Sequence, residues 1–342
     1  MLSDAVVLRR RPVGVPNRRT LRLEATAISP GPPPSADVLL AVRTLSVDPY
    51  MRLRMSACPP SYMEPFRLGE PLVGHGVAEV IRGGSAALPT GSLVTGLLPW
   101  AEYAYSSSRH LRPVPVGDFS DAQLLGVLGM PGLTAFVGLF RFGRPRSGES
   151  ILVSSAAGTV GLVAGQLARH HGCRVVGITR SRWKLPLLQQ AGFHDAIVYS
   201  GARDLSDNLP RVAPDGLDIA FDNVGGHVLD TAIDNMKPGG RIVSCGAIST
   251  YNQRGRRRGP PALGRLLERG IRLEGFNVED HALELERFER EVAHWLSSGV
   301  LQVPSSRVEG LANASVVFRG LFNGSFAGKV TLGVRGIGGR RP

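Results

Sequence analysis

A short apolar run, a glycine turn and a helical repeat, in that order, constrain the fold of this chain more than any other feature. Ile151, Leu152 and Val153 are apolar and partly β-branched, which predicts a buried strand. A turn of small residues follows, and apolar side chains then recur at helical spacing over 160–168. Strand, glycine turn and helix in this order are typical of the corner that holds the pyrophosphate of a dinucleotide at a helix N-terminus.

The turn has the spacing Ala-x-Gly-x-x-Gly, with Ala156 where the usual dinucleotide fingerprint has its first glycine. Gly158 would let the backbone approach the pyrophosphate, and Gly161 would let the helix pack closely on the strand. We predict that Gly158, Thr159, Val160 and Gly161 contact a cofactor. The alternative interpretation is an ordinary tight turn, but the strand before it and the helix after it favour a nucleotide site.

The end of the next predicted strand, at 173–179, distinguishes between the two nicotinamide cofactors. An NAD site usually has an acidic residue about 20 residues past the glycine turn, where it binds a ribose hydroxyl. This chain has Arg180, Arg182 and Lys184 there and no acid. Because cations attract a 2′-phosphate, with each charge-assisted bond worth roughly 1.5–3 kcal/mol, we predict NADPH. The alternative is a solvated basic helix start.

Length and composition limit the class of protein. A chain of 342 residues, 43% hydrophobic and 20% charged, can form two domains with their own cores. No apolar run approaches the roughly 18 residues of a membrane helix, and the basic cluster at 9–11 follows an apolar run, the reverse of a signal peptide. Three widely separated cysteines, Cys58, Cys173 and Cys245, indicate reduced thiols. We therefore expect a cytoplasmic protein with no membrane partner.

The formal net charge of +12 raises the question of a nucleic-acid partner. The arginines are spread along the chain, with clusters at 9–11 and 254–258. No aromatic residues interleave these clusters, as a stacking platform for bases would require. We therefore expect no nucleic-acid partner.

The periodicity of the sequence changes near residue 120 and predicts two domains. Residues 1–120 are short strand-like runs between turns, typical of a β-rich, barrel-like domain. From 121 to 304, strand-like runs alternate with helical segments, which predicts an α/β domain with a doubly wound parallel sheet. A last strand-like run at 328–334 could return to the first domain, which we expect to be completed by about 305–342. The predicted strands of the second domain are 150–154, 174–179, 195–199, 217–221, 240–246 and 271–276, and its predicted helices are 160–171, 182–191, 203–211, 227–236 and 281–298.

Six motifs follow one another along the chain: 46–52, 100–103, 129–135, the glycine turn, 221–226 and 245–252. In this order they resemble the medium-chain dehydrogenase/reductase superfamily, and most closely its zinc-free prostaglandin reductase and leukotriene 12-hydroxydehydrogenase branch, which includes curcumin reductase-like enzymes. The resemblance covers nearly the whole chain. It implies a GroES-like β-rich domain and a Rossmann domain that binds NADP.

The resemblance also implies the cofactor site, position by position. It places Lys184 and Tyr199 at the 2′-phosphate, and Asn223 beside the ribose and nicotinamide. It places the segment 245–251 beside the same groups, and Phe276 along the cofactor near the substrate. The residues that we assign to the cofactor in that segment are Cys245, Gly246, Ala247, Ile248, Ser249 and Tyr251.

Two positions depart from the family pattern. Arg180 stands where the family usually has glycine, so that it either adds a phosphate contact or crowds the adenine; we count it among the cofactor residues. Phe326 stands where the family has an asparagine that contacts the cofactor.

We expect no metal. Zinc-dependent relatives have an early cysteine ligand and a Gly-His-Glu segment, whereas this chain has Ser46, Val47 and Asp48 at the first place and Gly-His-Gly at 74–76. Without a cysteine cluster neither a catalytic nor a structural zinc site can be assembled. His75 is then a packed or hydrogen-bonded residue.

The resemblance implies reduction of the C=C bond of an α,β-unsaturated ketone or aldehyde by NADPH, with hydride passing to the β-carbon. Tyr251 is the candidate catalytic residue, donating a hydrogen bond to the carbonyl oxygen where enolate charge develops; alternatively it only packs beside the nicotinamide. Tyr50 is the candidate substrate contact, or belongs to the core. The expected partner is a small enone or enal, and relatives of this kind are often homodimers.

Other functions stay open from the sequence alone. A quinone oxidoreductase would share the fold and the NADPH cofactor. A non-catalytic protein that binds NADPH or nucleic acid on this fold belongs to a different class. The arginines at 254–258 would favour anionic substrates, such as acids or acyl thioesters, if they lie at the mouth of the cleft.

Overall fold

The computed structural model describes residues 2–27, 36–83, 88–115, 117–253 and 261–334. The arginine cluster at 254–258 lies outside these residues. Contacts divide the chain into two compact units, one of Met1–Leu125, Ser305–Phe326 and Val330–Pro342, the other of Gly126–Pro304 and Ala327–Lys329. The sequence analysis placed the division at 120/121 and 304/305.

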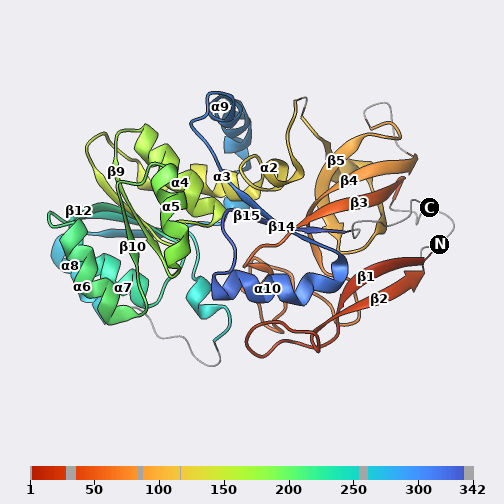
Figure 1. Ribbon diagram of the computed structural model, residues 1–342, viewed down its shortest axis with the longest axis horizontal. Coiled ribbons are helices and arrows are strands. Elements are labelled where there is room, and N and C mark those ends of the chain that lie inside the picture. Colours follow the sequence, from red (N-terminus) through yellow and green to blue (C-terminus); the bar gives the residue numbers. More distant parts are fainter. Residues whose placement is uncertain (1, 28–35, 84–87, 116, 254–260, 335–342) are drawn as a thin grey trace. The chain divides into compact units, whose positions relative to one another are not determined.

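Antiparallel pairing predominates in the first unit (Figure 1). β1 (Leu2–Leu8) and β2 (Leu21–Ala27) form a hairpin, and a seven-stranded sheet has the order β14-β15-β3-β4-β5-β7, with β6 paired to β3. The strands of this sheet are β3 (Val38–Ser46), β4 (Val73–Gly83), β5 (Leu93–Pro99), β6 (Tyr103–Ser106), β7 (Leu111–Pro113), β14 (Ser305–Glu309) and β15 (Lys329–Gly333). β15 pairs with β3, Thr331 opposite Ser46, so the predicted return of the last strand to the first domain is confirmed.

In the described part of this unit, three α-helices accompany the strands: α1 (Met51–Arg54), α2 (Asp121–Leu125) and α10 (Ala314–Asn323). The core of the unit joins the inward residues of the sheet with the apolar face of α10, and Trp100 stacks on Phe318 with ring centroids 5.6 Å apart. Pairing among the described strands leaves the seven-stranded sheet open at both ends. The first unit is therefore β-rich, as predicted, but its described strands do not close into a barrel.

The second unit contains a six-stranded sheet in which every pairing is parallel, with the order β10-β9-β8-β11-β12-β13. Its strands are β8 (Ser150–Val153), β9 (Arg174–Thr179), β10 (Asp195–Val198), β11 (Leu217–Asp222), β12 (Met236–Ser244) and β13 (Arg272–Gly275). This is the order of a doubly wound Rossmann sheet, as predicted. Strand order reverses at β8, because β9 and β10 lie on one side of it and β11 to β13 on the other.

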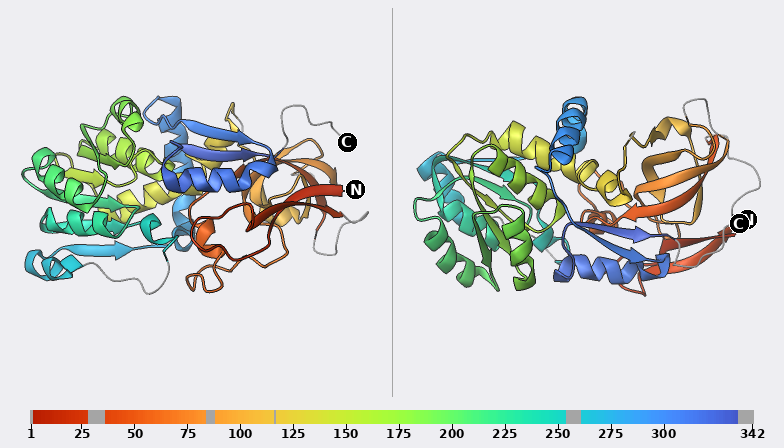
Figure 2. Two further views of the ribbon diagram at one scale, coloured as in Figure 1. Left: turned by 60° about the horizontal axis from the view of Figure 1, so that its bottom comes forward. Right: turned by 45° about the horizontal axis from the view of Figure 1, so that its top comes forward.

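Helices cover both faces of this sheet, as Figures 1 and 2 show. Ile151 and Val153 of β8 face one core and Leu152 faces the other, because side chains alternate along a strand. The first core packs on α3 (Met130–Val137), α4 (Thr159–His170), α5 (Leu185–Gln190) and α9 (Leu285–Ser297). The second packs on α6 (Ala202–Val212), α7 (His227–Asp234) and α8 (Gly264–Arg269).

Two predicted boundaries were wrong. β12 begins at Met236 and not at 240, because the Pro-Gly-Gly turn signal lies within the strand, where the pairing register with β11 shifts between Leu217 and Ile219. The helix expected from 281 begins at Leu285, because a 3-10 segment with a kink at His281 precedes it. In the described part of the chain, no helix combines the length and apolarity that crossing a membrane requires.

Candidate functional site

The predicted cofactor residues follow the carboxyl ends of the six parallel strands. Gly158 follows β8, Arg180 follows β9, Tyr199 follows β10, Asn223 follows β11, Cys245 follows β12 and Phe276 follows β13. In a parallel sheet these ends share one edge, and ligands of doubly wound folds bind outside that edge where strand order reverses. The sheet therefore brings residues from Gly158 to Phe276 to one edge, on both sides of β8.

Close approach of backbone to backbone shapes the glycine turn. Gly158 is the N-cap of α4, and Ser155 turns the chain with a positive φ of 50°. A Cβ on Gly161 would lie 2.6 Å from the Ser155 carbonyl oxygen and 2.8 Å from the Ala156 Cα. Glycine at 161 thus allows α4 to begin directly above β8, with the N–H groups of its first turn directed beyond the strand end.

A second segment pairs with this turn. The N–H of Gly328 donates to the Ala157 carbonyl oxygen at 2.8 Å, and Gly158 and Gly328 form a parallel β-bridge. Gly328 has a φ of 63°, and a Cβ there would lie 1.8 Å from the Pro304 carbonyl oxygen. The short segment Ala327–Lys329 is thereby fixed beside the glycine turn.

At the ends of β9 and β10 the structure places a buried cation without a carboxylate. Lys184 is only 8% exposed, and among the described residues it has no ion pair; its ammonium lies 5.2 Å from the centre of the Trp183 ring. Burial lowers the pKa of Lys184 from 10.5. An isolated buried charge is costly, so this position fits a bound anion such as the 2′-phosphate of NADP.

Tyr199 follows β10, which pairs with β9, and its N–H donates to the carbonyl oxygen of Thr179, the residue before Arg180. Burial raises the pKa of Tyr199 to about 12, against the opposing effect of the nearby Arg180 charge, so the phenol stays neutral and can donate a hydrogen bond. The Tyr199 ring packs edge-on against His227, with centroids 5.7 Å apart. His227 Nε2 is buried without a hydrogen-bond partner in the described part of the chain. Buried polar atoms are usually hydrogen-bonded, so this nitrogen fits a site where a ligand supplies the partner.

A buried hydrogen-bond network that the sequence analysis missed joins the ends of β8 and β11. The Asp222 carboxylate accepts from the Ser154 hydroxyl at 2.7 Å and from the N–H groups of Val224 and Gly225, both at 2.9 Å. Asn223 completes it, because its side-chain amide donates to the Ser154 carbonyl oxygen at 2.8 Å. Burial raises the pKa of Asp222, and these hydrogen bonds oppose the rise. The network fixes the loop that presents Asn223.

The same loop holds the segment after β12. The N–H groups of Cys245 and Gly246 both donate to the Asp222 carbonyl oxygen, at 2.8 and 3.1 Å. The Ile248 N–H donates to the Asn223 carbonyl oxygen at 3.2 Å, and the Ser249 hydroxyl donates to the Val224 carbonyl oxygen at 2.7 Å. These bonds bring the predicted residues of 245–249 next to Asn223.

Tyr251 folds back on the start of its own segment. The Ala247 N–H donates to the Tyr251 hydroxyl oxygen at 3.3 Å, and that oxygen lies 3.4 Å from where a Cβ of Gly246 would stand. The Asn223 carbonyl oxygen lies 3.2 Å from the same point. The phenol of Tyr251 and the Asn223 loop therefore meet over Gly246.

Cys245 and Phe276 complete the edge. Burial, and the charge of Asp222 nearby, raise the pKa of the Cys245 thiol to about 12, so it is not a thiolate at neutral pH. Phe276 stacks on Phe142, with centroids 4.9 Å apart and planes 18° from parallel. Phe276 and Phe142 are both packed against the core that α3 and α9 help to form.

The first unit holds the remaining predicted positions. Tyr50 stands at the start of α1 and is half-buried against the core of that unit. Phe326 packs on Gly320 of α10, where a Cβ would overlap its ring, so it serves as a core side chain at this position. The Ser46 hydroxyl donates to the Asp48 carboxylate. Among the described residues, no three acidic, histidine or cysteine side chains are grouped to hold a metal ion.

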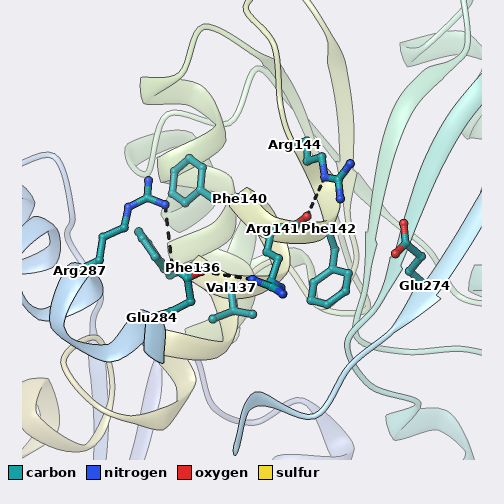
Figure 3. A pocket seen from close by; sticks show the side chains of 9 residues that line it. All are labelled: Phe136, Val137, Phe140, Arg141, Phe142, Arg144, Glu274, Glu284 and Arg287. Atoms are coloured by element: carbon teal, nitrogen blue, oxygen red, sulfur yellow. Dashed lines mark hydrogen bonds and ion pairs between the residues drawn. The ribbon is translucent and has the colours of Figure 1, made fainter. Parts of the chain in front are cut away.

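None of the predicted residues lines a cavity of about 600 Å³ in the second unit, although one of its lining residues, Phe142, stacks on Phe276 (Figure 3). Aromatic side chains of α3 and the following turn, and charged side chains from α9 and β13, line it. Its charges are largely compensated, because Arg141 and Arg287 lie 3.5 and 3.9 Å from the Glu284 carboxylate. Arg287 also lies over the Phe136 ring, 5.2 Å from its centre.

Comparison with known proteins identifies the family. A model of the N-terminal domain of oxidoreductases matches residues 5–114, and a zinc-binding dehydrogenase model matches 159–297. An NADP-dependent 2-alkenal reductase of Nicotiana tabacum is 37% identical over 330 residues, 96% of each chain. The NADPH-dependent curcumin reductase of Escherichia coli (strain K12) is 36% identical over 337 residues, also 96% of each chain.

A solved structure agrees with these relatives. The crystal structure of CurA in complex with NADPH from Vibrio vulnificus superposes with a TM-score of 0.90 at 33% identity, covering 99% of this chain and all of that one. The resemblance inferred from the motifs is thereby confirmed, as is the two-domain α/β fold. This chain belongs to the medium-chain dehydrogenase/reductase superfamily, in the branch of the alkenal, curcumin and prostaglandin reductases.

Proposed function

We propose that this protein is an NADPH-dependent oxidoreductase that reduces the C=C bond of α,β-unsaturated ketones and aldehydes. The observation that carries the proposal is the buried, carboxylate-free Lys184 at the end of β9, in a chain whose relatives are NADP-dependent alkenal and curcumin reductases. An NAD-selective site would have an acid near this position. When bound, the cofactor supplies the hydride.

The residues at the sheet edge have separate tasks in this proposal. The first-turn N–H groups of Gly158, Thr159, Val160 and Gly161 bind the pyrophosphate, because they carry the positive end of the α4 dipole. Lys184, Arg180 and Tyr199 bind the 2′-phosphate by charge and by hydrogen bonding.

The opposite end of the same edge orients the ribose and nicotinamide. Asn223, held by the Asp222 network, contacts the ribose, and the residues after β12 line the nicotinamide together with Phe276. We assign this lining to Cys245, Gly246, Ala247, Ile248, Ser249 and Tyr251. The neutral Cys245 thiol packs there and takes no part as a nucleophile.

Tyr251 is the proposed catalytic residue. Its hydroxyl oxygen accepts a hydrogen bond from the Ala247 N–H, and an accepted bond strengthens the hydroxyl as a donor. It would donate to the substrate carbonyl oxygen, where negative charge grows as hydride reaches the β-carbon. Tyr50 of the first unit is the proposed substrate contact.

The test is a spectrophotometric assay of NADPH oxidation with a panel of enones, enals and quinones, with NADH run in parallel. We expect turnover with enones and enals, and a strong preference for NADPH. Turnover with quinones alone would replace the proposal by a quinone oxidoreductase. No saturable NADPH binding, or a wide preference for NADH, would contradict it altogether.

Assembly and location are further proposals. We propose a homodimer, supported by the position of β13 as an outer strand of the parallel sheet, where its free side could pair with a second copy. Light scattering of the purified protein measures the mass.

We also propose a cytoplasmic location, supported by thiols with no disulfide partner among the described residues, and fractionation of the source cells tests it.

A further inference from the structure

We infer that the first unit has a second anion site, for a small organic molecule that carries a phosphate or pyrophosphate group. The site is a pocket of about 480 Å³ between the loop that joins β1 to β2 and the helix α10. The residues that line it are Pro16, Asn17, Arg18, Arg19, Ser315 and Arg319. None of them belongs to the proposed cofactor or substrate site, so the inference goes beyond the proposed function.

The charge of the pocket is not compensated. The loop at 9–20 and the helix at 314–323 together contain six arginines and no aspartate or glutamate. Arg9 pairs with Glu24 of β2, but in the part of the chain that the structure describes Arg18, Arg19 and Arg319 have no ion pair. The cavity of Figure 3 differs in this respect, because Glu284 there lies within 4.0 Å of two arginines.

Hydrogen bonds hold the loop in the shape that presents these cations. The Asn17 carbonyl oxygen accepts from the N–H groups of Thr20 and Leu21, both at 2.9 Å, and the Thr20 hydroxyl accepts from the Asn17 N–H at 2.8 Å. The Asn17 side-chain oxygen accepts from the Arg19 N–H at 2.9 Å. The turn is therefore formed before any ligand binds, which reduces the entropy cost of binding.

A buried arginine also holds this loop in place through hydrogen bonds. Arg52 of α1 is 7% exposed, and its guanidinium donates to the carbonyl oxygens of Gly14 at 2.9 Å and Pro12 at 3.1 Å. The loop is thus tied to the core on one side, and Arg18 and Arg19 line the pocket on the other.

The helix contributes a hydroxyl that is ready to bind. Ser315 lines the pocket and is only 7% exposed, and its hydroxyl has no hydrogen bond to another described residue. Arg319 is four residues further on and lies on the same face of α10. Guanidinium groups bind phosphate oxygens through paired N–H donors, and a serine hydroxyl adds one donor more. A carboxylate-free set of this kind selects an oxyanion.

The size of the pocket limits the ligand. A volume of about 480 Å³ is that of a pocket for a small molecule. Pro16 and the aliphatic stems of the arginines offer apolar surface for an organic remainder next to the phosphate. The geometry therefore points to an organic phosphate of nucleotide size, and not to a long polyanion.

The test is isothermal titration calorimetry with inorganic pyrophosphate and with ADP, at low ionic strength. One equivalent of NADP⁺ is added first, so that the proposed cofactor site is filled without an excess that would also occupy the second site. We expect saturable binding of both probes that weakens as salt is added. The variant Arg319→Gln and the double variant Arg18→Gln, Arg19→Gln should each weaken binding by about tenfold or more, since each removes a charge-assisted bond.

A matched control separates this site from general surface charge. Arg203→Gln also removes one positive charge, from a side chain that is 97% exposed on α6, and should leave binding of both probes unchanged. NADP⁺ affinity should be equal in all variants, which shows that they are folded. Equal weakening by Arg203→Gln, or no weakening by Arg319→Gln, would contradict the inference.

A last arm distinguishes the source of the phosphate. Vesicles with phosphatidylglycerol should bind less tightly than ADP, because a pocket fits a free phosphate better than a packed headgroup. Binding to such vesicles without binding of pyrophosphate or ADP would overturn the small-molecule site. Failure of NADP⁺ to bind would instead contradict the proposed function, and the pyrophosphate titration of the unliganded protein would still test this inference.

Discussion

The two ends of the proposed cofactor edge are built in different ways. At the glycine turn the proposed binding surface is the backbone itself, and the decisive feature of Gly161 is the side chain that it lacks. At the ends of β9 and β10 the proposed binding surface consists of side chains, those of Lys184, Arg180 and Tyr199. A change in the first region should therefore affect any dinucleotide, whereas a change in the second should affect only the choice between NADPH and NADH.

The strongest test of this contrast is Gly161→Ala. The added Cβ would lie 2.6 Å from a carbonyl oxygen of the strand turn, so α4 has to shift away from β8. We expect loss of binding of both NADPH and NADH, and a fall in the free energy of unfolding at the upper end of the about 1–3 kcal/mol typical of overpacking. Urea unfolding and cofactor titration measure the two effects.

Gly201→Ala is the matched control. Gly201 is the N-cap of α6, and its Cβ would have nothing within 4 Å. This variant should bind both cofactors like the original protein. If Gly161→Ala bound NADPH normally as well, the turn would not act through its backbone.

The next largest effect is expected from Lys184→Gln. Loss of the buried cation should weaken NADPH binding by about tenfold or more and leave NADH binding unchanged, because only NADPH has the 2′-phosphate. Arg203→Gln, on a side chain of α6 that is 97% exposed, is the control for net charge. An equal loss for both cofactors would place Lys184 elsewhere in the site.

The same lysine gives a pH dependence. Its pKa in the free protein is lowered from 10.5 by burial, so it loses its charge at a lower pH than an ordinary lysine. The preference for NADPH over NADH should therefore decline with rising pH before pH 10.5 is reached, and Lys184→Gln should abolish that decline. Titration of both cofactors at a series of alkaline pH values measures it.

Asp222→Asn tests the network that joins the end of β8, before the glycine turn, to the Asn223 loop. An amide keeps the shape of the carboxylate but presents N–H groups toward the donors of Val224 and Gly225, leaving a buried donor unpaired at a cost of about 1–3 kcal/mol. The pKa of Asp222 is raised in the fold, so the native state binds more protons and its contribution to stability falls as pH rises above 3.8.

The difference in unfolding free energy between the two proteins isolates that contribution. The excess stability of the original protein over Asp222→Asn should be larger at low pH and should shrink as pH rises through the raised pKa. The variant Asp218→Asn, whose carboxyl pKa is lowered in the fold, should give the opposite slope. A pH-independent difference for Asp222→Asn would mean that its pKa is not raised.

Local sequence patterns predicted the parallel strands and the residues at their ends, because a buried strand and a glycine turn each have a local signature. They could not predict what distant residues do to one another. Ser154 and Asp222 are 68 residues apart and look like ordinary polar positions, so their hydrogen bond becomes visible only when β8 and β11 are neighbours. Likewise, Arg319 lines one pocket together with Arg18 and Arg19, which lie about 300 residues earlier in the chain, and the sequence does not show this proximity.

Tyr251 combines a side-chain group with a backbone contact, and its substitution has the smallest expected effect. Its hydroxyl is a side-chain group, but the backbone N–H of Ala247 holds it in place. Tyr251→Phe removes one neutral hydrogen bond to the substrate oxygen, worth about 0.5–1.5 kcal/mol, so turnover on an enone should fall several-fold. NADPH affinity should not change, because the hydroxyl is assigned to the substrate and not to the phosphates. Steady-state kcat with saturating NADPH, beside a binding titration, separates the two.

Tyr199→Phe should show the converse, weaker NADPH binding with kcat retained. Unchanged turnover in Tyr251→Phe would remove this tyrosine from the reaction.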